Sequence, residues 1–114
     1  MSKVVIYHNP RCGKSRDTLA LLTERKVDVE VIEYLKTPPS AAQLTEILGK
    51  LGKKAHDIVR KKEASEAGIN VKALSEAELI KALVANPIAI ERPIVVNGDK
   101  AALGRPPESV LEIL

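Results

Sequence analysis

Hydrophobic residues near the two ends of the chain form short runs, typical of strands, while those in the middle recur every three to four positions. Lys3 to Tyr7 is rich in β-branched residues and predicts a buried strand. Val27 to Tyr34 alternates, with Val27, Val29 and Val31 on one side, and predicts a second strand. These runs place a strand on either side of the first polar segment.

Between the two predicted strands, Pro10 and Gly13 mark a loop. Ser15 is expected to cap a helix from about Arg16 to Arg25, whose inner face would carry Leu19 and Leu22. A strand, a helix and a second strand so close together predict a parallel pair with a right-handed crossover.

The middle of the chain predicts helices. After the break at Thr37-Pro38-Pro39, Ser40 with Gln43 and Ser75 with Glu78 have the spacing of capping boxes. Between them, His56 to Lys62 is expected to form a short helical turn, and Pro87 to end the second helix. The first helix is indicated by the i, i+3, i+4, i+7 spacing of Leu44, Ile47, Leu48 and Leu51. The second helix is expected to carry Leu79, Ile80, Leu83 and Val84 on its inner face.

The last segment returns to strands. Ile94-Val95-Val96 predicts a third strand, Asn97-Gly98 a hairpin turn, and Lys100 to Leu103 an antiparallel fourth strand. A final helix is expected to follow Pro106-Pro107 through Val110 and Leu111. The order predicts an α/β, thioredoxin-like fold over residues 1–114 as a single domain: a mixed four-stranded sheet flanked by helices, with a helical insertion in the middle.

Composition narrows the function classes. The 114 residues carry a net charge of only +3, and their only aromatic side chains are Tyr7 and Tyr34, so we expect no nucleic acid partner. The apolar runs are too short to cross a bilayer, and the first residues lack a signal-peptide layout. A single cysteine excludes an internal disulfide. We expect a cytoplasmic protein that acts as a monomer without membrane contact.

The candidate chemistry lies at Cys12. A free cysteine can be a small core residue, but Arg11, Gly13, Lys14 and Arg16 are poor neighbours for a core. A helix N-terminus and several cations both favour thiolate over thiol. The backbone N–H groups at this position would also hold an oxyanion beside the sulfur.

Spacing excludes several thiol chemistries. Ser15 stands where a dithiol oxidoreductase has its second cysteine, and Thr18 stands where a tyrosine phosphatase has its arginine. One cysteine and two histidines offer too few obvious ligands for zinc, so we expect no metal site. What remains is a single nucleophilic thiol that needs a second thiol from another molecule.

Other polar residues allow two interpretations each. His8 could pair with the thiolate or only hold the loop, and Ser15 could cap the helix, donate to the thiolate, or do both. Asn9 is expected to hold the turn. Arg60 follows the pattern of a solvated basic run, whereas Arg92 and Arg105 lie in rigid loops that suit oxyanion recognition or simple surface placement.

The chain resembles the glutaredoxin-coupled arsenate reductases of the thioredoxin superfamily over nearly its whole length. The matching segments are His8-Asn9-Pro10-Arg11-Cys12-Gly13-Lys14-Ser15-Arg16-Asp17-Thr18-Leu19, Arg60, Glu91-Arg92-Pro93-Ile94-Val95 and Leu103-Gly104-Arg105-Pro106-Pro107-Glu108. The resemblance implies that Cys12 is the nucleophile, that His8 and Ser15 assist it, and that Pro93 is a cis proline beside the site. It also implies that the arsenic oxyanion is bound by Arg60, Arg92 and Arg105, with the N–H groups of Gly13 and Lys14 beside them.

The resemblance implies a reaction and partners. Arsenate would be reduced to arsenite through a covalent arsenic adduct on Cys12, with glutathione as co-substrate, glutaredoxin as reductant and no bound cofactor. Two alternatives use the same fold: a glutathione-dependent thiol reductase or transferase, which needs no oxyanion site, and an Spx-type regulator that binds RNA polymerase. Redox-sensing members of the latter usually carry two cysteines where this chain has Cys12 and Ser15.

Overall fold

The computed structural model describes residues 4–114, so the predicted start of the first strand at Lys3 lies outside the described residues. The fold divides into two compact units. The sheet unit consists of the chain up to Thr37 together with Arg92–Leu114, and the insertion unit is Pro38–Glu91. The prediction of a single domain over 1–114 stays a prediction.

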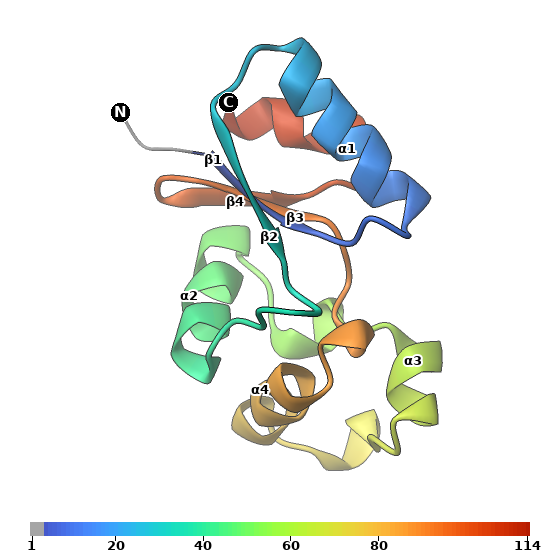
Figure 1. The fold of residues 1–114 in the computed structure, drawn as a ribbon. Helices are drawn as coiled ribbons and strands as arrows, with labels where there is room; N and C mark the ends of the chain where they lie inside the picture. Colours follow the sequence, from blue (N-terminus) through green and yellow to red (C-terminus); the bar gives the residue numbers. More distant parts are fainter. Residues whose placement is uncertain (1–3) are drawn as a thin grey trace. The chain divides into compact units, whose positions relative to one another are not determined.

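The sheet unit is built on four strands in the order β2-β1-β3-β4 (Figure 1). The strands are β1 (Val4–His8), β2 (Val29–Glu33), β3 (Ile94–Asn97) and β4 (Lys100–Leu103). β1 runs parallel to β2 and antiparallel to β3, which is antiparallel to β4. The mixed four-stranded sheet is therefore confirmed, and β1, one of its two inner strands, ends at the candidate cysteine loop.

The crossover from β1 to β2 contains the helix α1 (Gly13–Glu24), and the parallel pairing is as predicted. β2 is shorter than the predicted strand, which ran from Val27 to Tyr34, and it forms one edge of the sheet. Val27 and Val29 pack against the core, whereas Val31, placed on the same side by the predicted alternation, is 44% exposed.

The predicted hairpin between β3 and β4 is present, with its turn shifted by one residue. Asn97 pairs with Lys100, so the loop consists of Gly98 and Asp99 rather than Asn97 and Gly98. Gly98 has φ 63°, a left-handed conformation that glycine adopts without a steric penalty.

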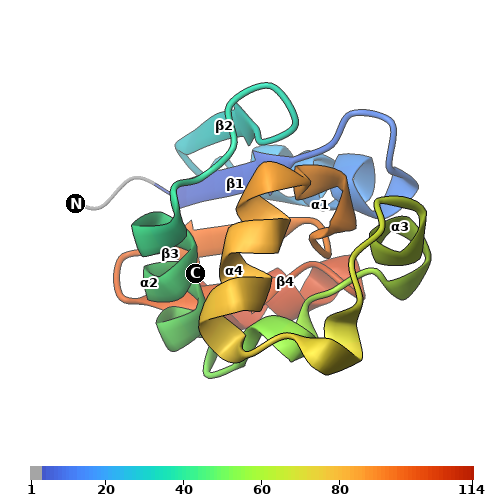
Figure 2. The ribbon, with the colours of Figure 1, turned by 90° about the horizontal axis from the view of Figure 1, so that it is seen from below.

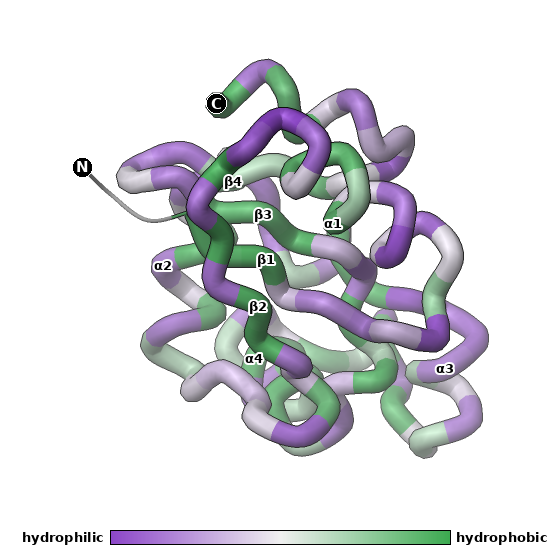
Figure 3. Tube along the Cα trace, turned by 45° about the horizontal axis from the view of Figure 1, so that its top comes forward, coloured by the Kyte–Doolittle hydropathy of each residue, from purple (hydrophilic) through white to green (hydrophobic). Residues whose placement is uncertain are grey.

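The core of the sheet unit gathers the apolar faces of the strands and of α1. In Figure 1, α1 and the C-terminal 3₁₀ helix η4 (Pro107–Ile113), predicted as an ordinary helix, lie together on one face of the sheet. Figure 3 shows the strands β1 and β3 as hydrophobic stretches. The buried core residues are Val4, Ile6, Leu22, Val95 and Val110.

The insertion unit is helical, as predicted, with α2 (Ala41–Leu51), α3 (Lys61–Glu66) and α4 (Glu76–Ala85). Both predicted capping boxes are confirmed, Ser40 with Gln43 and Ser75 with Glu78. In both views α4 lies between α2 and α3 (Figures 1 and 2). The fully buried leucines are Leu44, Leu79 and Leu83. Val84, which is expected to face inward, is only half-buried, as is Leu51 at the end of α2.

The predicted turn over His56 to Lys62 is wrong in detail. A 3₁₀ turn, η1 (Ala55–Asp57), is separated from α3 by Val59, which forms a β-bridge with Ile90. The N–H of Arg60 donates to the carbonyl of Ala89 at 2.7 Å, so a contact far along the chain interrupts the local helix. Two more 3₁₀ turns, η2 (Val71–Ala73) and η3 (Pro87–Ala89), complete this unit.

Candidate active site

The loop between β1 and α1 is shaped by Asn9. Its backbone carbonyl accepts a hydrogen bond from the N–H of Cys12 at 3.0 Å, and its side-chain oxygen accepts one from the N–H of Arg11, also at 3.0 Å. The guanidinium of Arg16 reaches back to the carbonyl of Pro10 at 3.1 Å. The expected role of Asn9 in holding the turn agrees with these contacts, and the loop delivers Cys12 to the start of α1.

Cys12, not Ser15, occupies the N-cap position of α1, so the helix begins at Gly13, three residues earlier than predicted. Cys12 has an extended backbone and makes no side-chain capping hydrogen bond. Gly13 and Lys14 are exposed in the first turn, where the backbone N–H groups have no partners within the helix. The half-buried sulfur therefore sits at the positive end of the helix.

The hydroxyl of Ser15 does not cap the helix but belongs to a buried hydrogen-bond network. Its hydroxyl accepts a hydrogen bond from the N–H of Asn9 at 3.0 Å and lies 2.7 Å from Nδ1 of His8. All three residues are buried. The prediction that Ser15 is the N-cap was wrong because its hydroxyl is already engaged by the end of β1. The network holds His8 against α1, which matches the loop-holding interpretation of His8.

Charges around His8 act in opposite directions. Burial lowers the pKa of His8, the carboxylate of Glu33 opposes this shift, and the charge of Arg16 adds to it, with a net lowering. Glu33 is the partner of His8 in the parallel register of β1 and β2. Both residues line a cavity of about 280 Å³ beside the cysteine loop, together with Arg11 and Lys36. His8 therefore favours its neutral form.

The environment of Cys12 favours its thiolate. Burial alone would raise the pKa of the thiol, but the N–H of Ser15, the side chain of Arg92 and the N–H of Lys14 together lower it below its ordinary value. The direction is the one expected from the sequence. Ser15 thus acts on the sulfur through its backbone, while its hydroxyl serves His8 and Asn9.

Arg92 and Arg105 come from opposite ends of the β-hairpin. Arg92 is 9% exposed and precedes Pro93 through a cis peptide bond, as expected. Arg105 donates a hydrogen bond from Nη1 to the carbonyl of Arg92 at 3.1 Å. A second cis bond, Arg105–Pro106, was not predicted. The structure therefore brings together three of the predicted site residues: Cys12, Arg92 and Arg105.

Gly104 allows this part of the chain to pack closely. Its N–H donates to the carbonyl of Pro93 at 3.0 Å. A Cβ atom at Gly104 would meet Oγ1 of Thr18 and would lie 2.7 Å from Cγ of Pro93. The side chain of Thr18 is fixed in turn by a hydrogen bond to the carbonyl of Lys14 at 2.8 Å. In the sequence Gly104 is only one residue of the matching C-terminal motif, and its position does not predict the close contact with Thr18 and Pro93.

Arg60 belongs to the insertion unit and is not a freely solvated cation. Its side chain is 24% exposed and forms ion pairs with Glu63, at 3.2 Å from Nε, and with Glu91, at 2.9 Å from Nη1. These carboxylates raise the pKa of Arg60 against the effect of burial. Sequence reasoning missed both partners, although Glu91 directly precedes Arg92 in a quoted motif.

Other kinds of site have no support within residues 4–114. No cluster of three or more histidine, cysteine or acidic residues is placed to hold a metal ion in this part of the chain. No helix among these residues is long and apolar enough to cross a membrane.

Comparison with known proteins identifies the family of the chain. Residues 7–113 match the ArsC family over almost the whole chain. The chain belongs to the ArsC family. The chain is 47% identical to the arsenate reductase of Haemophilus influenzae, over 97% of this chain and 98% of that protein. The uncharacterized protein YfgD of Escherichia coli K12 is 52% identical over 98% of this chain and 97% of its own length.

A solved structure extends the comparison to three dimensions. The arsenate reductase from Vibrio cholerae superposes with a TM-score of 0.93 at 46% identity, over 99% of this chain and 98% of that one. The thioredoxin-like fold expected from the sequence is thereby confirmed for this ArsC protein.

Proposed function

We propose that this ArsC protein reduces arsenate to arsenite, with Cys12 as the nucleophile. The observation that carries the proposal is the position of Cys12 at the N-terminus of α1, where the N–H groups of Lys14 and Ser15 and the side chain of Arg92 lower the pKa of the thiol. A thiolate supplies the nucleophile, and the same donors can neutralise an oxyanion bound to it. Relatives that match over nearly their whole length and are named arsenate reductase support the choice of substrate.

The proposed reaction begins with attack of the Cys12 thiolate on arsenic. A sulfur–arsenic bond forms and one arsenic–oxygen bond breaks, and that oxygen leaves as water after taking up protons. Arg92 and Arg105 neutralise the adduct together with the N–H groups of Gly13 and Lys14, and Arg60 is the third arginine assigned to this role by resemblance.

The second half of the reaction needs another thiol, because Cys12 is the only cysteine of the chain. We propose glutathione as this thiol. Its sulfur forms a mixed disulfide with Cys12, arsenic takes up the two electrons that the sulfurs lose, and arsenite leaves. Glutaredoxin then reduces the mixed disulfide. Overall, one arsenate and two thiols give one arsenite, one disulfide and water.

The decisive experiment is an arsenate-reduction assay with glutathione and glutaredoxin. We expect turnover by the wild type and a loss of about 10³-fold or more in the Cys12→Ser variant. Replacing glutaredoxin by thioredoxin in a parallel assay tests the proposed partner. Absence of Cys12-dependent arsenite formation with either reductant contradicts the proposed activity.

Two measurements on Arg92 separate this activity from a thiol reductase without an oxyanion site. We expect Arg92→Ala to raise the KM for arsenate about tenfold or more, since it removes a charge-assisted contact. We also expect it to raise the pKa of Cys12, measured by thiolate absorbance against pH. Arg25→Ala, an exposed arginine at the far end of α1, is the matched control. An unchanged KM for arsenate in Arg92→Ala would favour the thiol reductase.

A further inference from the structure

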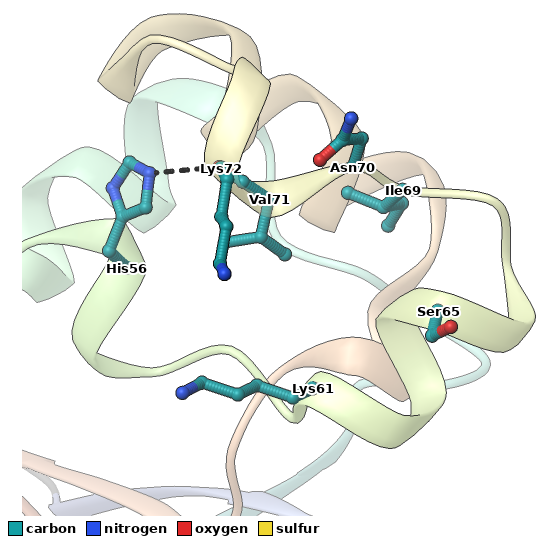
Figure 4. Close-up of a pocket in the computed structure, with 7 residues that line it drawn as sticks. All are labelled: His56, Lys61, Ser65, Ile69, Asn70, Val71 and Lys72. Atoms are coloured by element: carbon teal, nitrogen blue, oxygen red, sulfur yellow. Dashed lines mark hydrogen bonds between the residues drawn. The ribbon is translucent and has the colours of Figure 1, made fainter.

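The insertion unit contains a cavity that the proposed arsenate chemistry does not use. Its volume is about 570 Å³, and its walls come from η1, α3 and η2 with the segment that joins them. Figure 4 shows the lining side chains around an open centre. Pockets of this volume commonly hold small organic molecules in proteins.

The charge of the cavity is positive. Lys61 of α3 and Lys72 of η2 both line it, and Figure 4 shows their amino groups on the side of the hollow that also holds His56. None of the residues that line the cavity is acidic. Neither lysine takes part in an ion pair within residues 4–114. Two ammonium groups thus share one hollow without a carboxylate in its wall.

The rest of the wall is divided between apolar and neutral polar side chains. Ile69 and Val71 lie opposite Lys61 in Figure 4 and offer carbon surface, and the stems of the lysines add to it. Ser65 and Asn70 contribute a hydroxyl and an amide that can donate hydrogen bonds. A ligand that complements this wall has an anionic group and a short apolar body.

His56 links the elements that form the wall of the cavity. Its Nε2 donates to the carbonyl of Val71 at 3.2 Å, drawn as a dashed line in Figure 4, and its Nδ1 lies 3.6 Å from Glu76 at the start of α4. These contacts tie η1 to η2 and to α4. The wall that carries Lys72 is therefore formed before any ligand binds, which reduces the entropic cost of binding.

We propose that this cavity binds a phosphate monoester of a small organic molecule. Such a group carries a charge between about −1.5 and −2 near neutral pH, which the two lysines balance. A ligand with a single carboxylate would leave part of the positive charge of the lysines uncompensated. The apolar body of the ester would lie on Ile69 and Val71. None of the residues of this site belongs to the cysteine loop, so the site would give the protein a binding function in addition to the proposed reductase activity.

The test is a titration of the full-length, ¹⁵N-labelled wild type with n-butyl phosphate and, separately, with inorganic phosphate, followed residue by residue by NMR. We expect saturable shifts at the amides of Lys61, Ser65 and residues 69–72, with a Kd on the order of 1 mM for the ester. Inorganic phosphate is expected to bind there more weakly, because it lacks the apolar body.

Matched variants make the assignment specific. Lys61→Gln and Lys72→Gln are each expected to weaken binding of the ester about tenfold. The control is Lys62→Gln, which removes the same charge from an exposed residue that does not line the cavity. This variant is expected to leave the Kd within about twofold of the wild-type value. Equal weakening by all three variants, absence of saturation, or shifts confined to residues 8–16 would overturn the proposal. None of these readouts depends on arsenate reduction.

Discussion

The helix α1 of the sheet unit begins in a different way from α2 and α4 of the insertion unit. The hydroxyls of Ser40 and Ser75 each accept a hydrogen bond from a backbone N–H of their helix, at 3.1 and 3.2 Å. In return, the backbone N–H of Ser40 donates to the side chain of Gln43, and that of Ser75 donates to the side chain of Glu78. The corresponding position of α1 holds Cys12, whose side chain makes no capping hydrogen bond. The N-termini of α2 and α4 are therefore capped by side chains of their own sequence, whereas the N-terminus of α1 has no side-chain cap.

The difference separates a structural helix start from a reactive one. Each serine cap accepts from one N–H of the first turn of its helix. At α1 the N–H groups of Lys14 and Ser15 instead favour the Cys12 thiolate and lower the pKa of the thiol. α1 is held instead by contacts outside its own sequence, through Ser15 to β1 and through Thr18 to Gly104. Stability of this helix is therefore expected to depend on tertiary contacts more than that of α2 or α4.

The largest expected effect comes from Gly104→Ala. The added methyl group would overlap Thr18 and Pro93, so we expect a loss of about 3 kcal/mol in the free energy of unfolding. Gly49→Ala in α2 is the matched control: a Cβ there meets nothing within 4 Å, and we expect a gain of about 0.5–1 kcal/mol from helix propensity. Urea unfolding measures both. A gain in both variants would show that α1 is not held by close packing at Gly104.

A smaller loss is expected from Ser15→Ala. The change leaves Nδ1 of His8 and the N–H of Asn9 buried without this hydroxyl, and we expect a cost of about 2 kcal/mol. Ser75→Ala, which removes an exposed cap, is expected to cost about 1 kcal/mol. Thermal unfolding of the two variants compares a tertiary contact with a local cap directly. If Ser75→Ala proves the more costly change, the contrast between the two helix starts is refuted.

The pH dependence of stability tests the burial of His8. Its pKa is lowered in the folded protein, so below about pH 6.5 the unfolded chain binds more protons and stability falls as the pH falls. The slope is at most about 1.4 kcal/mol per pH unit for one proton. We expect His8→Gln to reduce this slope, measured by urea unfolding between about pH 5 and pH 8. An identical slope in wild type and variant would mean that His8 does not titrate in this way.

The smallest expected effect has the opposite sign. Cys12→Ser places a good capping residue at the open start of α1, and we expect a gain of about 0.5–1 kcal/mol in stability while activity is lost. Cys12→Ala, which can neither cap nor react, is the control and is expected to show no gain. A thermal midpoint of Cys12→Ser at or below that of Cys12→Ala would contradict the view that this position gives up capping for reactivity.

The sequence predicts those parts of the fold that depend on local pattern. The strands, the parallel crossover, the hairpin and both capping boxes follow from hydrophobic period and from turn or cap residues close together in the chain. The errors lie where a distant partner changes the local outcome. Ser15 has the residue type of a cap but is bound by His8 and Asn9, and the predicted turn after His56 is interrupted by the bridge between Val59 and Ile90.

The candidate site shows the same limit. The reactive character of Cys12 follows from its neighbours in the sequence, but its proximity to Arg92 depends on the pairing of β1 with β3, which spacing alone does not reveal. The link from Arg105 to the carbonyl of Arg92 likewise requires the hairpin to be folded. For Arg60, the run of lysines that follows it suggested a solvated charge, and only the structure shows Glu63 and Glu91 around its guanidinium.

The sheet unit is discontinuous in the chain, and this fixes an order of events during synthesis. The ribosome releases β1 and β2 first, then all of Pro38–Glu91, and only afterwards the strands β3 and β4. The inner strand β1 therefore has only one of its two neighbours until the last fifth of the protein has emerged. For a nascent chain the helical insertion acts as a delay, during which the unpaired edge of β1 is open to chaperones and to wrong partners.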